Sequence, residues 1–168
     1  LYQIAQWYPQ VAMYDDLRGW DRDQYLGKGE FYNQFGSFDV RITAPAGWLV
    51  GATGTLSNAA EVLAPATRDR LARALRADTT VHVVTANDRG AGTATAAAGA
   101  GGTLTWHFTA PMVNDFAFVA SRDFVLDATH ADTPDPTLVQ VLYLPEHTQY
   151  RASAQLARFA LEHHARLV

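Results

Sequence analysis

The chain has 168 residues, of which 48% are hydrophobic and 18% charged, and its formal net charge is −4. This composition fits one globular domain with a core and excludes a disordered segment. The mild charge gives no case for nucleic-acid binding, and no apolar run approaches the roughly 20 residues of a membrane helix. Cysteine is absent, which excludes disulfides and thiolate metal sites. The compartment stays open between cytoplasmic and exported, because a signal peptide could lie upstream of Leu1.

The first third of the chain is predicted to be rich in strands. Residues 1–14 are expected to form a strand, and residues 15–29 a loop that contains several glycines. The clearest pattern covers residues 30–45, where apolar and polar side chains alternate, so one face of the strand is buried and the other is wet. Residues 48–57 are expected to be the return strand.

The middle of the chain mixes helix, strand and loop signals. A short amphipathic helix that begins near Pro65 is predicted within residues 58–77. Residues 79–86 are β-branched, and residues 103–109 are expected to pair with them as a hairpin across a loop rich in Gly and Ala. A further strand region covers residues 116–128.

The last part of the chain reads as connector, strand and helix. A polar connector with prolines is predicted over residues 129–137, and a long helix over residues 146–168. The helix carries an apolar stripe made of Tyr150, Ala154, Ala157, Leu161 and Val168. A sandwich with its own core has little reason to cover that stripe. We therefore expect it to pack on a further part of a longer protein. In this chain alone, we expect either a contact with a second copy through this helix or poor order after about residue 146.

The order of elements predicts the fold class. It is mainly β, an antiparallel β-sandwich or saddle-like sheet with one short helix and a C-terminal helix.

Two adjacent carboxylates, Asp15 and Asp16, lie among aromatic and apolar residues. Neighbouring strand residues point to opposite faces, so the two side chains are not expected to act together on one bond. Aspartate commonly ends strands, because its side chain bonds the backbone of the following turn. The pattern therefore favours a structural role, and no catalytic residue is predicted.

The positions of the histidines in the sequence do not predict a metal site. None of the six is followed by Glu, so the HExxH zinc motif is absent from these 168 residues. His163 and His164 point about 100° apart on a helix and are poor co-ligands. His82 and His107 are expected to face each other across a hairpin, but two histidines without a third ligand are more commonly structural.

Aromatic residues crowd the first quarter of the chain. A sandwich core uses buried aromatics and a sugar-binding platform uses exposed ones, and the core is the commoner case. Trp20 and Tyr25, both in the predicted loop, are the expected exceptions.

An ordered series of segments resembles a known family. The series runs through WYP, VAMYDD, GEFY, FGSFDVRITAP and VGATGTL, and it continues with VNDFAFVASRDF and LYLPEHTQYRASAQLARFALEHHARL. It resembles the N-terminal β domain and the start of the catalytic domain in the aminopeptidase N family of zinc metallopeptidases, the gluzincins. The likeness covers nearly the whole chain and is weakest over residues 87–102. The cysteine and proline that the family usually has in its acidic turn are missing from VAMYDD, as in a divergent branch.

The resemblance implies a domain plan. Residues 1–128 would be a β-sandwich accessory domain whose first strands precede Leu1. Residues 129–137 would be a connector, and residues 138–168 the first strand and helix of a catalytic domain. Zinc and the HExxH motif would belong to the rest of that domain, so no cofactor is expected in this chain.

The resemblance also implies roles for single residues. Asp15 would hold the turn, and Gln3, or else Gln6, would bind the free amino group of a peptide substrate. The alternative is that both glutamines are solvent-facing strand residues. The implied function is a non-catalytic domain that covers the active-site cleft of its catalytic partner domain. A free-standing carbohydrate- or protein-binding module and a small hydrolase with scattered acidic residues remain open.

Overall fold

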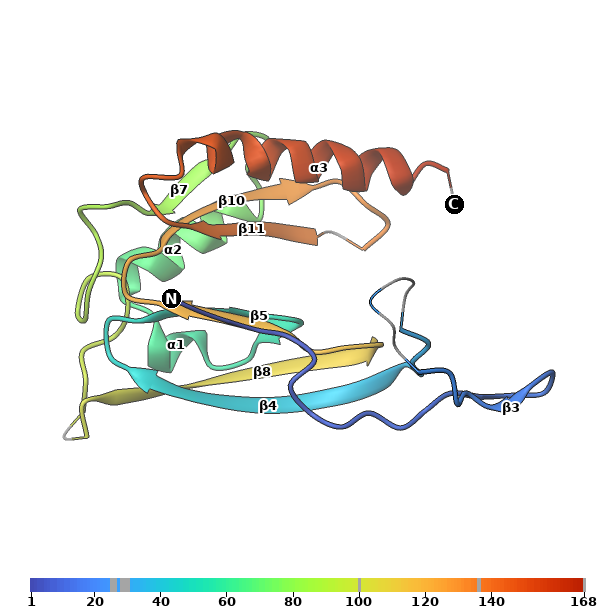
Figure 1. The fold of residues 1–168 in the computed structure, drawn as a ribbon. Helices are drawn as coiled ribbons and strands as arrows, with labels where there is room; N and C mark the ends of the chain where they lie inside the picture. Colours follow the sequence, from blue (N-terminus) through green and yellow to red (C-terminus); the bar gives the residue numbers. More distant parts are fainter. Residues whose placement is uncertain (25–26, 28–30, 100, 136, 168) are drawn as a thin grey trace.

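The computed structural model describes residues 1–24, 27, 31–99, 101–135 and 137–167. Its strands form antiparallel sheets stacked in layers, with a C-terminal helix over the outermost sheet (Figure 1). The predicted fold class, mainly β with antiparallel sheets and a C-terminal helix, is confirmed. None of the helices in the described ranges is both long and apolar enough to cross a membrane.

The lower sheet is built around the strand with the clearest sequence pattern. β4 (Gly36–Pro45) pairs with β8 (Thr103–Val113), which also pairs with β6 (Thr55–Leu56). The alternation predicted in β4 is present, because Val40 and Ile42 pack against the core while their polar neighbours are exposed. On the wet face, the hydroxyls of Thr43 and Thr105 hydrogen-bond across the strands at 2.9 Å.

The middle sheet joins segments that are far apart in the sequence. β9 (Phe118–Ser121) lies between β1 (Tyr2–Ile4) and β5 (Leu49–Ala52). The prediction that residues 48–57 form one return strand beside β4 is wrong, because the chain turns at Gly54 and places β5 in this second sheet. Gly54 has φ +88°, and a Cβ there would lie 2.3 Å from the carbonyl oxygen of Thr109, so the turn requires glycine.

The upper sheet has β10 (Val125–Ala131) at its centre, with β7 (Val81–Val84) on one side and β11 (Thr137–Tyr143) on the other. The predicted hairpin between residues 79–86 and 103–109 is therefore wrong, since β7 pairs with β10 and β8 pairs with β4 and β6. The predicted connector is also wrong in part. Its first residues, Thr129 to Ala131, continue β10 and pair directly with β11.

Two short helices flank the sheets. α1 (Ala59–Val62) precedes α2 (Pro65–Ala74), and Pro65 is in the first turn of α2, where a missing N–H costs nothing. Arg70 of α2 donates to the carbonyl oxygen of Val83 at 3.0 Å and to Asp88 at 2.9 Å. These bonds connect α2 to the end of β7. The pKa of Asp88 is lowered to about 2, first by its hydrogen bond from the Thr85 side chain and then by Arg70.

The C-terminal region consists of a 3₁₀ turn, η1 (Thr148–Ala152), followed by α3 (Ser153–His164), which packs on β10 and β11. Of the predicted stripe, Ala154 is only 1% exposed and is covered by the chain's own upper sheet, whereas Tyr150 and Leu161 are exposed and Val168 lies outside the described residues. The upper sheet therefore covers part of the predicted stripe, and an outside partner for the rest of it stays a prediction. Alanines make a flat face that approaches a sheet closely. Leu156, Phe159 and Leu167, which are not members of the stripe, are also exposed.

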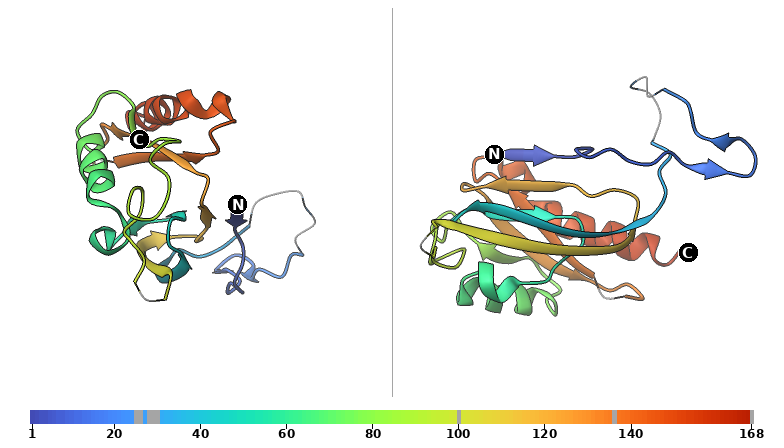
Figure 2. Two further views of the ribbon diagram at one scale, coloured as in Figure 1. Left: turned by 90° about the vertical axis from the view of Figure 1, so that its left-hand side faces the viewer. Right: turned by 90° about the horizontal axis from the view of Figure 1, so that it is seen from below.

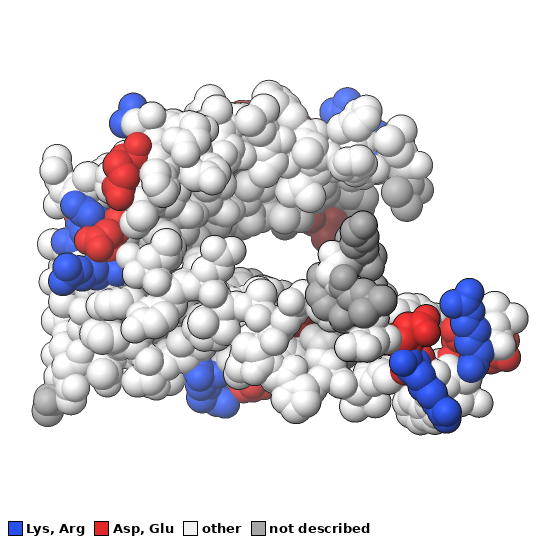
Figure 3. Space-filling model, in the orientation of Figure 1, with Lys and Arg blue, Asp and Glu red and all other residues white. Residues whose placement is uncertain are grey.

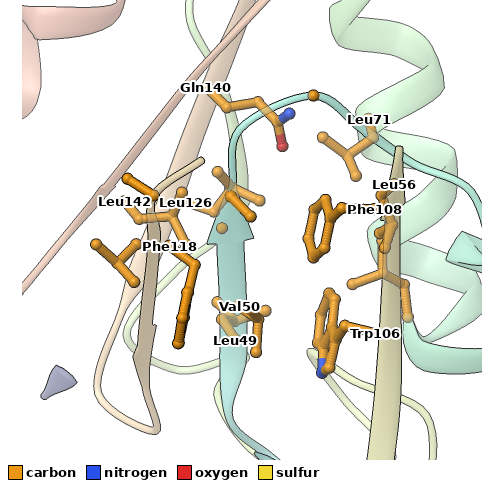
Figure 4. A pocket seen from close by; sticks show the side chains of 16 residues that line it. Leu49, Val50, Leu56, Leu71, Trp106, Phe108, Phe118, Leu126, Gln140 and Leu142 are labelled. Carbon is orange, nitrogen blue, oxygen red and sulfur yellow. The ribbon is translucent and has the colours of Figure 1, made fainter. Parts of the chain in front are cut away.

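An apolar pocket of about 300 Å³ lies between the layers (Figure 4). Phe108 and Trp106 face Phe118 and Leu142 across it, and Gln140 is the polar side chain that points toward it. Figure 3 also shows the molecule hollowed between its upper and lower layers. Most of the lining belongs to the hydrophobic core or packs against it, so we regard this pocket as an extension of the core.

Candidate functional site

The sequence-predicted binding residues lie on and just after an edge strand. Gln3 pairs with Val119 through the backbone of β1, and its side chain is exposed. Gln6 is also exposed and has φ +53°, a value uncommon for a residue other than glycine. Among the described residues, neither glutamine side chain has a hydrogen-bond partner, and the structure does not bring them together with another polar side chain.

The segment after β1 is fixed to the loop before β9. Trp7 donates its indole N–H to the carbonyl oxygen of Phe116 at 2.9 Å. Gln10 and the hydroxyl of Tyr8 both bond the Asp115 carboxylate, at 3.0 and 3.3 Å. The first strand predicted over residues 1–14 is thus broken: β1 covers only three residues, and side-chain bonds hold the chain beyond it.

Beyond that anchor the chain forms an arm, residues 11–24, which projects from the sheets (Figure 2). β2 (Tyr14–Asp15) and β3 (Gly19–Trp20) pair as a two-stranded hairpin, and the rings of Tyr14 and Trp20 meet edge to face at 5.2 Å. Both rings are exposed. The predicted exposure of Trp20 is present, while Tyr25 lies outside the described residues.

Asp15 closes the turn of this hairpin. Its carboxylate accepts hydrogen bonds from the backbone N–H groups of Arg18 at 2.6 Å and Leu17 at 2.9 Å. The Arg18 bond is the main cause that holds the pKa of Asp15 below its usual range. These are the contacts of a turn-forming aspartate. Asp16, its neighbour, makes no hydrogen bond through its side chain among the described residues.

A pocket of about 510 Å³ lies on the arm. Trp20 and Tyr32 line it together with a set of charged side chains of both signs: Asp15, Arg18, Asp21, Arg22 and Asp23. The hydroxyl of Tyr32 reaches the Asp15 carboxylate at 3.4 Å, which links the arm to the segment that precedes β4. Aromatic faces beside hydrogen-bonding groups can bind polar ligands that also have apolar faces.

A buried polar cluster that sequence reasoning missed lies in the upper sheet. Asp127, in the middle of β10, is 2% exposed. Its carboxylate oxygens bond the ring Nδ1 of His82 at 2.6 Å and the hydroxyl of Tyr143 at 2.8 Å. His82 comes from β7 and Tyr143 from β11, so one carboxylate joins three strands. The signal in the sequence was a carboxylate between two apolar neighbours, Leu126 and Ala128, in the strand VLDATHA.

Tyr143 of this cluster should make the stability of the protein depend on pH in the alkaline range. Burial and the hydrogen bond to Asp127 raise its pKa from 10.0 to about 12. The folded protein therefore holds this proton more tightly than the unfolded chain does. The resulting stabilisation, roughly 2–3 kcal/mol, should be complete below pH 10 and lost as pH rises from about 10 to about 12.

The measurement is the free energy of unfolding between pH 9 and 12, compared with that of a Tyr143→Phe variant. The variant should show a smaller alkaline loss. Equal losses in both proteins would show that Tyr143 is not responsible.

The two strand histidines do not meet. His82 bonds Asp127 in the upper sheet, whereas His107 bonds Asp39 at 3.0 Å in the lower sheet. The expectation that they face each other is wrong, because it depended on a hairpin that does not form. Within the described residues, no three His, Cys, Asp or Glu side chains gather in a way that could hold a metal ion.

Comparison with known proteins gave no match to a family model, a curated protein or a solved structure.

Proposed function

We propose that this chain is the non-catalytic β domain of a zinc aminopeptidase-like metallopeptidase, and that it covers the active-site cleft of a catalytic domain in the same protein. The observation that carries the proposal is the number of exposed aromatic side chains within residues 2–35. These are Tyr2, Trp7, Tyr14, Trp20, Phe31, Tyr32 and Phe35. Soluble domains rarely leave so many large rings in water unless the surface binds something.

The charge distribution supports a docking face. In Figure 3, Lys, Arg, Asp and Glu lie mainly toward the edges of the molecule and on the projecting arm, and much of the surface of the two layers between them is uncharged. The cores of protein–protein interfaces are depleted in charge and enriched in aromatic residues. A neighbouring domain is therefore a suitable partner for this face.

In this proposal Gln3 has a specific task. It lies on an edge strand, and its exposed side-chain amide has no hydrogen-bond partner among the described residues, so its carbonyl oxygen can accept a hydrogen bond from the free amino group of a peptide substrate. Gln6 is the second candidate for the same task. Zinc would be held by the catalytic domain and would supply the Lewis acid that activates water.

The domain boundary proposed from the sequence falls within the hairpin of β10 and β11. Residues 138–168 would then be the start of the catalytic domain, and the upper sheet would be shared between the two domains. The exposed Leu156 and Phe159 of α3 would face the rest of that domain, or a second copy of the chain.

The chain on its own is expected to be inert. With no His-Glu dipeptide in the sequence, it should hydrolyse no aminoacyl reporter substrate and bind no stoichiometric zinc. Metal analysis of untagged protein, together with a fluorogenic assay in the presence of added zinc, checks both expectations. One zinc per chain, or turnover that a chelator abolishes, would contradict a non-catalytic role.

A carbohydrate-binding module is the second candidate function, favoured by the arm pocket with Trp20 and Tyr32. Sugars stack on aromatic faces and bond charged or amide groups around them. Saturable quenching of tryptophan fluorescence by a soluble oligosaccharide, lost in a Trp20→Ala variant, would favour this function over the first.

A further inference from the structure

A pocket of about 270 Å³ opens at the end of the upper sheet, beside η1. Its polar lining includes His82, Asp127 and Tyr143 from the three strands and Arg151 from η1. Most of the remaining lining is apolar, with Val84 and Pro145 among its members. The pocket is separate from the arm and uses none of the residues assigned to the proposed function.

The polar side of this pocket has unused hydrogen-bonding capacity. Both oxygens of Asp127 are engaged inside the protein, one by His82 and the other by Tyr143. The carboxylate can only accept, so His82 must donate through Nδ1. Its second ring nitrogen, Nε2, is then left for a ligand, and the His82 side chain is 65% exposed.

The positive charge of Arg151 is also unused. Among the described residues, its guanidinium has neither a hydrogen bond nor an ion pair, although Asp127 lines the same pocket. Arg151 is near enough to Tyr143 to act on the pKa of its phenol, which it lowers against the stronger effect of burial. An arginine that has no partner among the described residues, at a pocket whose carboxylate already bonds two other side chains, is available to an anion.

We propose that this pocket binds a small organic carboxylate with an apolar body. The planar guanidinium of Arg151 matches the two oxygens of a carboxylate and can donate to both. Nε2 of His82 can donate to the same carboxylate when the ring carries both protons. The apolar body lies against Val84 and Pro145, where it displaces water from apolar surface. Inorganic phosphate would satisfy the charge but not the apolar lining.

The test is an NMR titration of the ¹⁵N-labelled chain at constant ionic strength with three probes: benzoate, its neutral analogue benzamide, and inorganic phosphate. Benzoate should produce saturable shifts at Ala86 and Arg151, and benzamide and phosphate should bind more weakly. Arg151→Gln should weaken benzoate binding about tenfold, the loss expected for a charge-assisted bond. His82→Gln should weaken it less, because Arg151 remains.

Arg166→Gln is the matched control, since Arg166 is exposed just beyond α3 and should leave binding unchanged. Arg151→Lys keeps the charge without the planar fork and should give an intermediate affinity. Three results would each overturn the proposal: benzoate binding that Arg151→Gln does not change, benzamide binding as tight as benzoate, or phosphate binding tighter than benzoate. The amide spectrum of each variant establishes that it is folded.

Discussion

Asp127→Ala is expected to lower the free energy of unfolding by about 2–3 kcal/mol, because the hydroxyl of Tyr143 would be left buried without an acceptor. The same change removes the bond that joins β10 to β7 through His82. Chemical denaturation followed by circular dichroism gives the value. The loss should appear as a lower denaturation midpoint with an unchanged slope.

Two further variants test whether the loss of stability comes from the hydrogen bond between Tyr143 and Asp127 or from the removal of a negative charge. Asp69→Ala, on the exposed side of α2, removes an aspartate that makes no hydrogen bond through its side chain among the described residues, and should change stability little. Tyr143→Phe removes the hydroxyl itself. Combined with Asp127→Ala, it should cost less than the sum of the two single changes, because the orphaned group is gone. If the loss in the double variant equals the sum of the two single losses, the hydrogen bond between Tyr143 and Asp127 does not contribute to stability.

The second large effect concerns the buried face of α3. Ala154→Asp should destabilise the protein by roughly 3 kcal/mol or more, since it places an unpaired charge between the helix and the upper sheet. For a chain of this size, the melting temperature should fall by about 10 °C. Thermal unfolding followed by circular dichroism measures it.

Ala160→Asp is the matched control, because Ala160 lies on the exposed side of the same helix. It should leave the melting temperature nearly unchanged. If both changes have the same small effect, α3 does not pack on the sheet through Ala154. The chain would then behave as the sequence first suggested, with a helix that its own core does not use.

The sequence predicted local features well, because these depend on neighbouring residues. The alternation in β4 and the helix that begins at Pro65 are each visible within about ten residues. The mainly β class followed from the number of such segments. The C-terminal helix was also visible, although it was predicted over residues 146–168 and α3 covers Ser153–His164 after a 3₁₀ turn.

Local sequence patterns could not predict which distant strands pair with each other. β8 has alternating residues that suit several partners, and only the whole fold selects β4 and β6 over β7. For the same reason the polar cluster was missed, since His82 lies 45 residues before Asp127. The alanine face of α3 was recognised as apolar, but periodicity cannot say which surface covers it.

The proposed function depends most directly on what the same gene encodes after residue 168. The account predicts that the reading frame continues into a catalytic domain with an HExxH motif and a further Glu ligand downstream. Sequencing the source gene through that region measures this. A stop codon directly after residue 168, or an unrelated domain without the zinc motif, would contradict the account and leave the binding-module function as the better one.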